Sequence, residues 1–422
     1  MLLTSPLSSP LKNPVRDVFS PAGGSSLTAQ VQALFAGRAG GMWDMGDIAT
    51  LFQDAATPVT AVTQPIGMVL DKSQGLILGP ELVTNGDFSG GTTGWVPRAG
   101  AATHAVVGGE MEVTAINTSA QVTEQSFSVV SGRTYKVTGT MRAAGTNSVA
   151  NSARISINGA TVFSLAQVSA NGVQTPFSLF ATANSSTFQV QLSVASLGAW
   201  GAIGDKAYFD NISIKEIPGN HATQPTAGSR SLYQVVSGYG CAQFDGVNDL
   251  LQVSGINLSA TNKVLIGLAF KPNTTAASIA MEYSTTAVSN IGAFYVSINE
   301  SGTGKHNMLA NSGGSGLVDV VTLSSAVALA PTVLIDYIDL AQLVSTAKHS
   351  VRVNGASAGI TSVIDSTDVA GNFGNYDLFL GARSGSSVPS NMNLYRAFVL
   401  AGSSTAGEQL ILENWLRESC GV

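Results

Sequence analysis

The chain has 422 residues, a formal net charge of −6 and only 11% charged residues, and this length accommodates two or three domains. It has no basic cluster and no apolar run near the ~20 residues of a membrane-spanning helix, so we expect neither nucleic acid nor a membrane as a partner. Its 46 glycines favour short strands joined by tight turns, and its two cysteines are too few for a disulfide scaffold.

The N-terminal region divides into an extended arm, residues 1–26, and a small, partly helical segment, residues 27–79. The arm lacks hydrophobic periodicity, so two interpretations stay open: a disordered terminus, or a segment that becomes ordered only against a partner. The second segment opens with apolar residues at the i, i+4, i+7 and i+8 spacing of an amphipathic helix. These residues are Leu27, Val31, Leu34 and Phe35. A second short helical turn is expected over residues 47–54.

A period-two pattern of apolar and polar residues predicts an antiparallel β-sandwich over residues 80–217. The strand 188–194 is one example, and turn signals such as Asn158-Gly159 separate the strands. The Pro-Gly-Asn sequence that follows this sandwich predicts a linker over residues 218–240.

The same alternation continues over residues 241–422 and predicts a second sandwich. Asp245 and Asn248, in its first turn, could coordinate calcium or cap the turn, and the spacing favours the turn. One helix closes the chain, because Thr405 and Glu408 form a capping box ahead of an apolar pattern. The predicted fold class is therefore mainly β: two tandem antiparallel sandwiches after a partly helical N-terminal segment, and a C-terminal helix.

Two stretches at the ends of the first sandwich resemble the first and last strands of jelly-roll carbohydrate-binding modules. They are ELVTNGDFSGGTTGW, residues 81–95, and AYFDNISIKE, residues 207–216. The resemblance implies a jelly roll that binds sugars. Members of the family often carry a structural calcium beside these strands, which makes Asp87 and Asp210 the candidate metal ligands. No other cofactor is expected.

The second sandwich resembles the concanavalin-A-like, laminin-G-type fold. The matching stretches are AQFDGVNDLLQV at 242–253, VRVNGASAG at 351–359 and NLYRAFVLAGSSTAGEQLILENWL at 393–416. Glucanases share this fold, but their Glu-x-Asp-x-x-Glu strand is missing from the sequence, so we expect no catalytic residues and no enzymatic activity. In the resembled fold the two ends of the domain are close, which places Cys241 near Cys420 and leaves both a disulfide and free thiols open.

The stretch ALFAGRAGGMWDMGDIATLFQDAATPVTAVTQPIGMVLDKSQGL, residues 33–76, resembles the leader of virion proteins of tailed bacteriophages. The resemblance implies that residues 27–79 attach the chain to other virion proteins, that the chain is a homotrimer, and that it is located in the virion after assembly in the host cytoplasm. The candidate attachment residues are Phe19, Leu34, Phe35, Trp43 and Phe52.

Exposed aromatic rings are the candidate glycan contacts, because sugars stack on them through their apolar faces. The candidates are Trp95, Trp200 and Tyr208 in the first sandwich, and Tyr376 and Tyr395 in the second. Trp200 is the strongest of them, because glycines flank it in a predicted loop.

The leading functional hypothesis is a non-catalytic component of a tailed-phage virion, a tail fibre or appendage that presents lectin-like sandwiches to host polysaccharide or lipopolysaccharide. The alternatives are a capsid decoration or head-fibre protein, or a bacterial surface glycan-binding protein. A glycan-degrading enzyme is disfavoured, because such enzymes need two facing carboxylates. Asp336 and Asp339 are the nearest approach to a pair, and their odd spacing places them on opposite faces of one strand.

Overall fold

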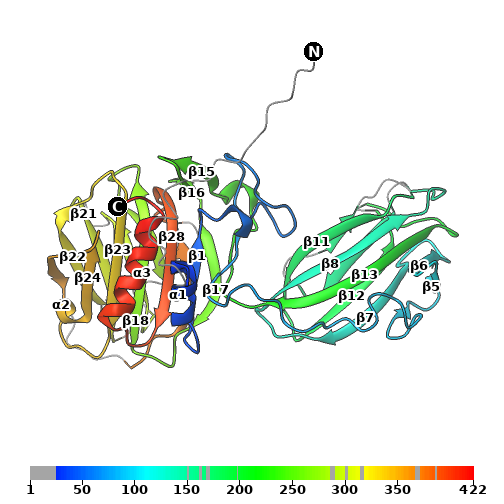
Figure 1. Ribbon diagram of the computed structural model, residues 1–422, viewed down its shortest axis with the longest axis horizontal. Coiled ribbons are helices and arrows are strands. Elements are labelled where there is room, and N and C mark those ends of the chain that lie inside the picture. The colour runs from blue at the N-terminus through cyan, green and yellow to red at the C-terminus, as the bar shows by residue number, and fades with distance from the viewer. Residues whose placement is uncertain are drawn as a thin grey trace, which may run out of the picture.

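The structure, a computed structural model, describes residues 25–149, 152–160, 164–167, 172–196, 198–285, 290–299, 303–313, 318–365, 371–384 and 387–422. These residues form four antiparallel sheets, which pack as two β-sandwiches (Figure 1). The predicted fold class is confirmed: the chain is mainly β, with a helix at its C-terminus. Within the described part of the chain, no helix is long and apolar enough to cross a membrane.

The small sandwich consists of two five-stranded sheets. The first sheet has the order β10 (Ser164–Gln167), β9 (Ala153–Asn158), β12 (Thr187–Val194), β7 (Val122–Ser128) and β4 (Val96–Pro97). The second has the order β11 (Thr175–Thr182), β8 (Thr134–Ala143), β13 (Lys206–Ile217), β6 (Glu110–Ala115) and β5 (Ala102–Val107). Alternate apolar side chains of both sheets fill the core between them, among them Ile155, Leu192 and Phe209.

The large sandwich has a sheet of eight strands and a sheet of ten. The eight-stranded sheet has the order β15 (Leu232–Val236), β16 (Tyr239–Asp245), β28 (Asn391–Ala401), β18 (Lys263–Pro272), β23 (Thr332–Asp339), β24 (His349–Val353) and β25 (Ala356–Ser357), and β1 (Gly40–Asp44) also pairs with β28. The other sheet has the order β2 (Leu51–Phe52), β3 (Met68–Val69), β14 (Ala222–Thr223), β17 (Leu251–Asn257), β27 (Asn375–Leu380), β19 (Ser278–Tyr283), β20 (Phe294–Ile298), β21 (Lys305–Asn311), β22 (Val318–Ala326) and β26 (Ile360–Ile364).

Helices cover the outer face of the eight-stranded sheet (Figure 1). They are α1 (Leu27–Leu34) and α3 (Ala406–Glu418), and both follow the sequence prediction; α3 has the expected capping box. Three shorter helical turns are η1 (Ile48–Thr50), η2 (Ala227–Ser229) and α2 (Ser345–Lys348). The turn expected over residues 47–54 is therefore only partly helical, because β2 begins at Leu51.

The small sandwich is inserted between two neighbouring strands of the large one. Strand β3 precedes it in the sequence and β14 follows it, and these two strands pair with each other. The two connections are also tied together: the backbone N–H of Asp71 donates to His221 Nδ1 at 2.9 Å, and the backbone N–H of Asn220 donates to Asp71 Oδ2 at 2.7 Å. Burial lowers the pKa of His221 to about 4, so its ring stays neutral and keeps accepting this hydrogen bond.

The structure corrects the prediction that residues 27–79 form a separate segment. Strand β1 pairs along β28, and β2 and β3 extend the ten-stranded sheet. The predicted linker, residues 218–240, likewise contains β14 and β15 and is part of both sheets. Sequence periodicity missed this because β1 and β3 pair with strands that are distant in the sequence, β28 and β14.

Cys241 and Cys420 are both buried and unpaired, in one apolar cluster between the eight-stranded sheet and α3. Burial raises the pKa of Cys241 to about 12 and that of Cys420 to about 11. Both thiols therefore stay protonated near neutral pH, which makes them poor nucleophiles and metal ligands.

Candidate functional site

The outer surface of the sheet β10-β9-β12-β7-β4 carries a row of polar side chains, called the polar face below. In β12, Phe188, Val190 and Leu192 point into the core, so the residues between them point outward. Register then places the outward residues of β9, β12 and β7 side by side. The polar face consists of Glu124, Ser126, Arg154, Ser156, Asn158, Gln189, Gln191 and Ser193.

A chain of hydrogen bonds holds the centre of the polar face. Asn158 Nδ2 donates to Gln189 Oε1 at 2.9 Å, and Gln191 Nε2 donates to the same oxygen at 3.0 Å. Gln191 Nε2 also donates to Glu124 Oε2 at 3.2 Å. Arg98, beyond the end of β4, pairs with this glutamate at 2.8 Å. These contacts fix the planes of the two glutamine amides across three strands.

The other end of the polar face has an arginine and a tryptophan. Arg154 lies opposite Ser193, and its buried Nε has no hydrogen-bond partner among the described residues. Trp200 forms an isolated β-bridge with Ala195. Ala195 follows the end of β12 and faces the same side of the sheet as Ser193. Its side chain is half-buried, so part of the indole faces solvent.

This arrangement suits a ligand rich in hydroxyl groups. Amide, hydroxyl and guanidinium groups supply both donors and acceptors in a fixed pattern, and an indole at the end supplies an apolar surface. Gln191 is only 8% exposed, and its amide is held by hydrogen bonds to Gln189 and Glu124. Side chains held this firmly lose little conformational entropy when a ligand binds.

Two of the five predicted glycan contacts are buried, and the structure corrects both. Trp95 is 4% exposed in the core of the small sandwich, where it packs against Phe88 and donates from Nε1 to the carbonyl of Asn85. Tyr395 is 1% exposed beneath α3. Neither ring can stack on a sugar, because both are buried within the chain.

Two more predicted contacts are half-buried and engaged elsewhere. The ring of Tyr208 lies on the opposite sheet with the guanidinium of Arg142 3.7 Å from its centroid, and its hydroxyl donates to Glu112 at 2.9 Å. Tyr376 packs against Tyr283 in the large sandwich and donates to the carbonyl of Ile291 at 2.8 Å. Only Trp200 lies next to the polar face, through its backbone bridge with Ala195, and its role there stays a prediction.

The predicted metal ligands, Asp87 and Asp210, lie near each other in the small sandwich, with Asp210 on β13, the central strand of its sheet. Burial raises the pKa of Asp210, and the negative charges of Glu110 and Asp87 raise it further. Each aspartate already accepts hydrogen bonds from a neighbour in sequence, Ser89 and Asn211. Over the described ranges, no three His, Cys, Asp or Glu side chains gather in a group that could hold a metal, so a calcium ion here stays a prediction.

Two of the five predicted attachment residues are buried in the large sandwich, and two more are half-buried. Phe35 and Trp43 are 1% and 0% exposed, Leu34 packs against the cluster under α3, and Phe52 contacts Phe180 of the small sandwich at a centroid distance of 4.9 Å. The burial of Phe35 and Trp43 within the chain contradicts their prediction as attachment residues, whereas the role of the half-buried Leu34 and Phe52 stays a prediction. Phe19 lies outside the described residues.

The amides of the polar face were not among the binding residues predicted from the sequence. Gln189 and Gln191 occupy the polar positions of the strand 188–194, which the alternation identified, but alternation alone does not separate a binding face from a solvated one. The residue types gave no such signal, because it is the register of the strands that brings these amides together.

The sequence of the small sandwich matches a family of known function. Residues 80–197 match the model of a carbohydrate binding domain, and the small sandwich is thus a carbohydrate-binding-module domain with a second β-sandwich beside it. No curated protein matches the chain.

Solved structures similar to the chain include a family 4 carbohydrate-binding module, at 15% identity over 32% of this chain and 99% of that one, with a TM-score of 0.25. The sialidase CBM40 of Ruminococcus gnavus bound to α2,3-sialyllactose is 14% identical, over 38% and 96% of the chains, with a TM-score of 0.28. The CBM22 tandem of Paenibacillus barcinonensis Xyn10C is 11% identical, over 77% and 98%, with a TM-score of 0.29. At such TM-scores these likenesses carry no functional argument.

Proposed function

We propose that the chain is a non-catalytic glycan-binding protein and that the polar face is its binding site. The observation that carries the proposal is the chain of oriented amides, with Arg98 and Arg154 beside it, on the domain that matches the carbohydrate-binding family. A polysaccharide segment would lie across β9, β12 and β7, and its hydroxyls would exchange hydrogen bonds with Asn158, Gln189 and Gln191. One sugar ring would stack on Trp200.

The proposal predicts that Gln191→Ala weakens binding to the best ligand of a polysaccharide panel about tenfold, measured by calorimetry. The substitution removes one hydrogen-bonding amide and releases Gln189 and Glu124 from their fixed positions, and losses near 1.4 kcal/mol correspond to a factor of ten. Trp200→Ala is expected to weaken binding by a similar amount. Gln409→Ala, on α3 of the large sandwich, is the matched control and keeps full affinity. Equal affinities for Gln191→Ala and the unaltered chain would contradict this assignment.

We further propose that the protein is located on the virion of a tailed phage, as a tail fibre or appendage. The less favoured alternatives are a head-fibre protein, a capsid decoration protein and a bacterial surface protein. This placement rests on the resemblance of residues 33–76 to virion leaders. Because Phe35 and Trp43 are buried in the same chain, the proposal assigns attachment to the arm, residues 1–26, in a homotrimer. Removal of residues 1–24 is therefore expected to leave folded protein that is absent from purified particles. Incorporation at the normal level, judged by immunoblotting of particles, would contradict the placement.

A further inference from the structure

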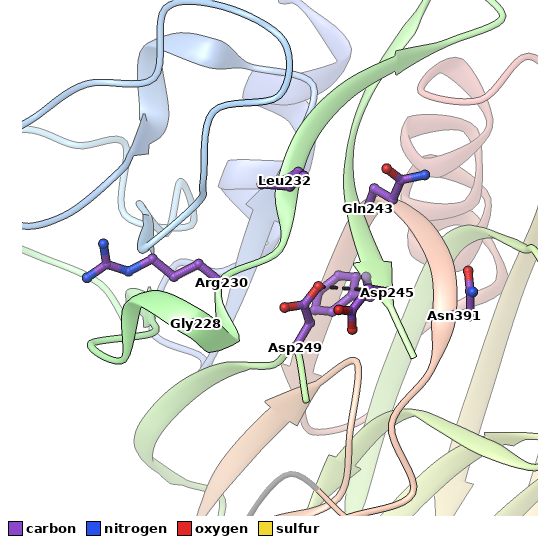
Figure 2. Close-up of a pocket in the computed structure, with 8 residues that line it drawn as sticks. Gly228, Arg230, Leu232, Gln243, Asp245, Asp249 and Asn391 are labelled. Atoms are coloured by element: carbon purple, nitrogen blue, oxygen red, sulfur yellow. Dashed lines mark hydrogen bonds between the residues drawn. The ribbon is translucent and has the colours of Figure 1, made fainter. Parts of the chain in front are cut away.

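A second cavity lies in the large sandwich, away from the polar face (Figure 2). Its volume is about 430 Å³, which falls in the range of small-molecule sites. Four parts of the chain line it: the segment from η2 to β15, strand β16, the turn that follows β16, and the start of β28. The lining residues are Gly228, Arg230, Leu232, Gln243, Phe244, Asp245, Asp249 and Asn391.

The turn after β16 points a buried carboxylate into this cavity. Asp245 Oδ1 accepts from the backbone N–H of Val247 at 2.8 Å, which confirms the predicted turn. Asp249 Oδ2 accepts from the backbone N–H of Asp245 at 3.0 Å (Figure 2). The other oxygen, Oδ1, accepts no hydrogen bond from a described residue and stays accessible to solvent, although Asp249 as a whole is only 5% exposed. An accessible carboxylate oxygen without a protein donor can accept a hydrogen bond from a ligand in the cavity.

The carboxylates of Asp245 and Asp249 make the cavity negative. The one cationic residue of its lining, Arg230, binds backbone carbonyls outside the cavity. Arg230 donates from Nε to the carbonyl of Gln224 and from Nη2 to the carbonyl of Pro225, each at 2.9 Å. Figure 2 shows its guanidinium directed away from Asp245 and Asp249. The start of β28 contributes only the neutral Asn391. Burial raises the pKa of Asp249 to about 6, and the charge of Asp245 adds to this effect.

The remaining side chains offer neutral hydrogen bonds and an apolar wall. The amide of Gln243 makes no side-chain hydrogen bond with any described residue, and Asn391 uses only its oxygen, which accepts from Asn273 Nδ2 at 3.1 Å. Leu232 is 37% exposed beside them. A ligand that fits must therefore present a cationic donor to the two aspartates and hydroxyl groups to the two amides.

We propose that this cavity is a second binding site and that it takes an amino sugar with a free amine. The ammonium group would lie against Asp249 and Asp245, and the ring hydroxyls would bind Gln243 and Asn391. Acidic sugars are disfavoured, because both fixed charges facing the site are negative. The inference does not depend on the polar face, which lies in the other sandwich.

Glucosamine titrated into the full chain tests the site, with the methyl resonances of Leu232 as the reporter and those of Leu410, exposed on α3, as the control. At pH 7 we expect saturable shifts at Leu232 alone, with an affinity at least fivefold higher than for glucose or N-acetylglucosamine, which lack the ammonium. Asp249→Asn preserves the acceptor for Asp245 and should lower the glucosamine affinity about tenfold. Gln191→Ala should leave it unchanged, which separates this test from that of the polar face.

The pH dependence distinguishes a direct contact from a structural role of Asp249. Glucosamine stays cationic between pH 7 and pH 5, whereas Asp249 gains a proton as the pH falls through about 6. The affinity should therefore fall severalfold over this range in the unaltered chain and stay flat in Asp249→Asn. Equal affinities for glucosamine and glucose, no shift at Leu232, or the same pH dependence in both proteins would each overturn the proposal.

Discussion

Removal of residues 1–78 is expected to yield insoluble protein, whereas removal of residues 1–24 should leave both sandwiches folded. The longer deletion takes away β1, which pairs along β28 in the middle of the eight-stranded sheet, and both β2 and β3 of the other sheet. It also removes eleven apolar side chains that are at most 4% exposed. They are Val31, Phe35, Met42, Trp43, Met45, Leu51, Val59, Ile66, Met68, Val69 and Leu70.

The size of the effect follows from burial. Each such side chain contributes about 1.5–3 kcal/mol, so the set exceeds the roughly 5–15 kcal/mol that separates a typical folded domain from its unfolded chain. Solubility on expression and circular dichroism of the two truncations measure the outcome. A soluble, cooperatively melting protein that lacks residues 1–78 would contradict the assignment of β1 to the large sandwich.

A single substitution gives a finer version of the same test. Trp43 is 0% exposed in the core of the large sandwich, and its Nε1 donates to the carbonyl of Asn220 at 2.8 Å, next to the connection from the small sandwich. Trp43→Ala should lower the free energy of unfolding by about 3–5 kcal/mol. A substitution at a partner-facing attachment residue would leave the stability of the isolated chain unchanged.

The sequence predicted the elements of this fold better than their partners. Local patterns located α1 and α3, and the alternation located strands such as β12, predicted over residues 188–194. Alternation reports which face of a strand is buried, but it does not report which strand lies beside it. The pairing of β1 with β28 joins residues from opposite ends of the chain, as Met42 with Phe398, so the N-terminal segment looked independent.

The binding site was harder to predict for a related reason. Aromatic residues were the natural candidates for sugar contacts, yet the same rings are the best core residues, and the sequence does not reveal which role applies. Trp95 and Tyr395 lie in cores, whereas Trp200, in a glycine-flanked loop, is half-buried. The amides of Gln189 and Gln191 become a site only because register places Asn158 and Glu124 beside them.

Asp336 and Asp339, the two aspartates of β23, point to opposite faces of the sheet and cannot act as a carboxylate pair. Asp339 pairs with Lys263 at 2.8 Å. Asp336 lies between Leu334 and Ile338, whose side chains fill the core of the large sandwich, and its Oδ2 contacts His349 Nδ1 at 2.6 Å. The side chains of Asp336 and His349 are both 0% exposed, so neither can reach a polysaccharide.

Asp336→Ala is therefore expected to lower the free energy of unfolding by about 3–5 kcal/mol, because removing one member of a buried pair leaves the other without compensation. The loss is acute here, since His349 Nε2 already has no partner in the described part of the chain. Asp336→Asn is the matched control: its amide oxygen can still accept from His349 Nδ1, so it should cost less. Thermal melting measures both variants, and a decrease in melting temperature on the order of 10 °C is expected for Asp336→Ala.

Neither variant should change the release of reducing ends from a polysaccharide; an activity lost in Asp336→Asn at an unchanged melting temperature would make Asp336 a functional residue after all.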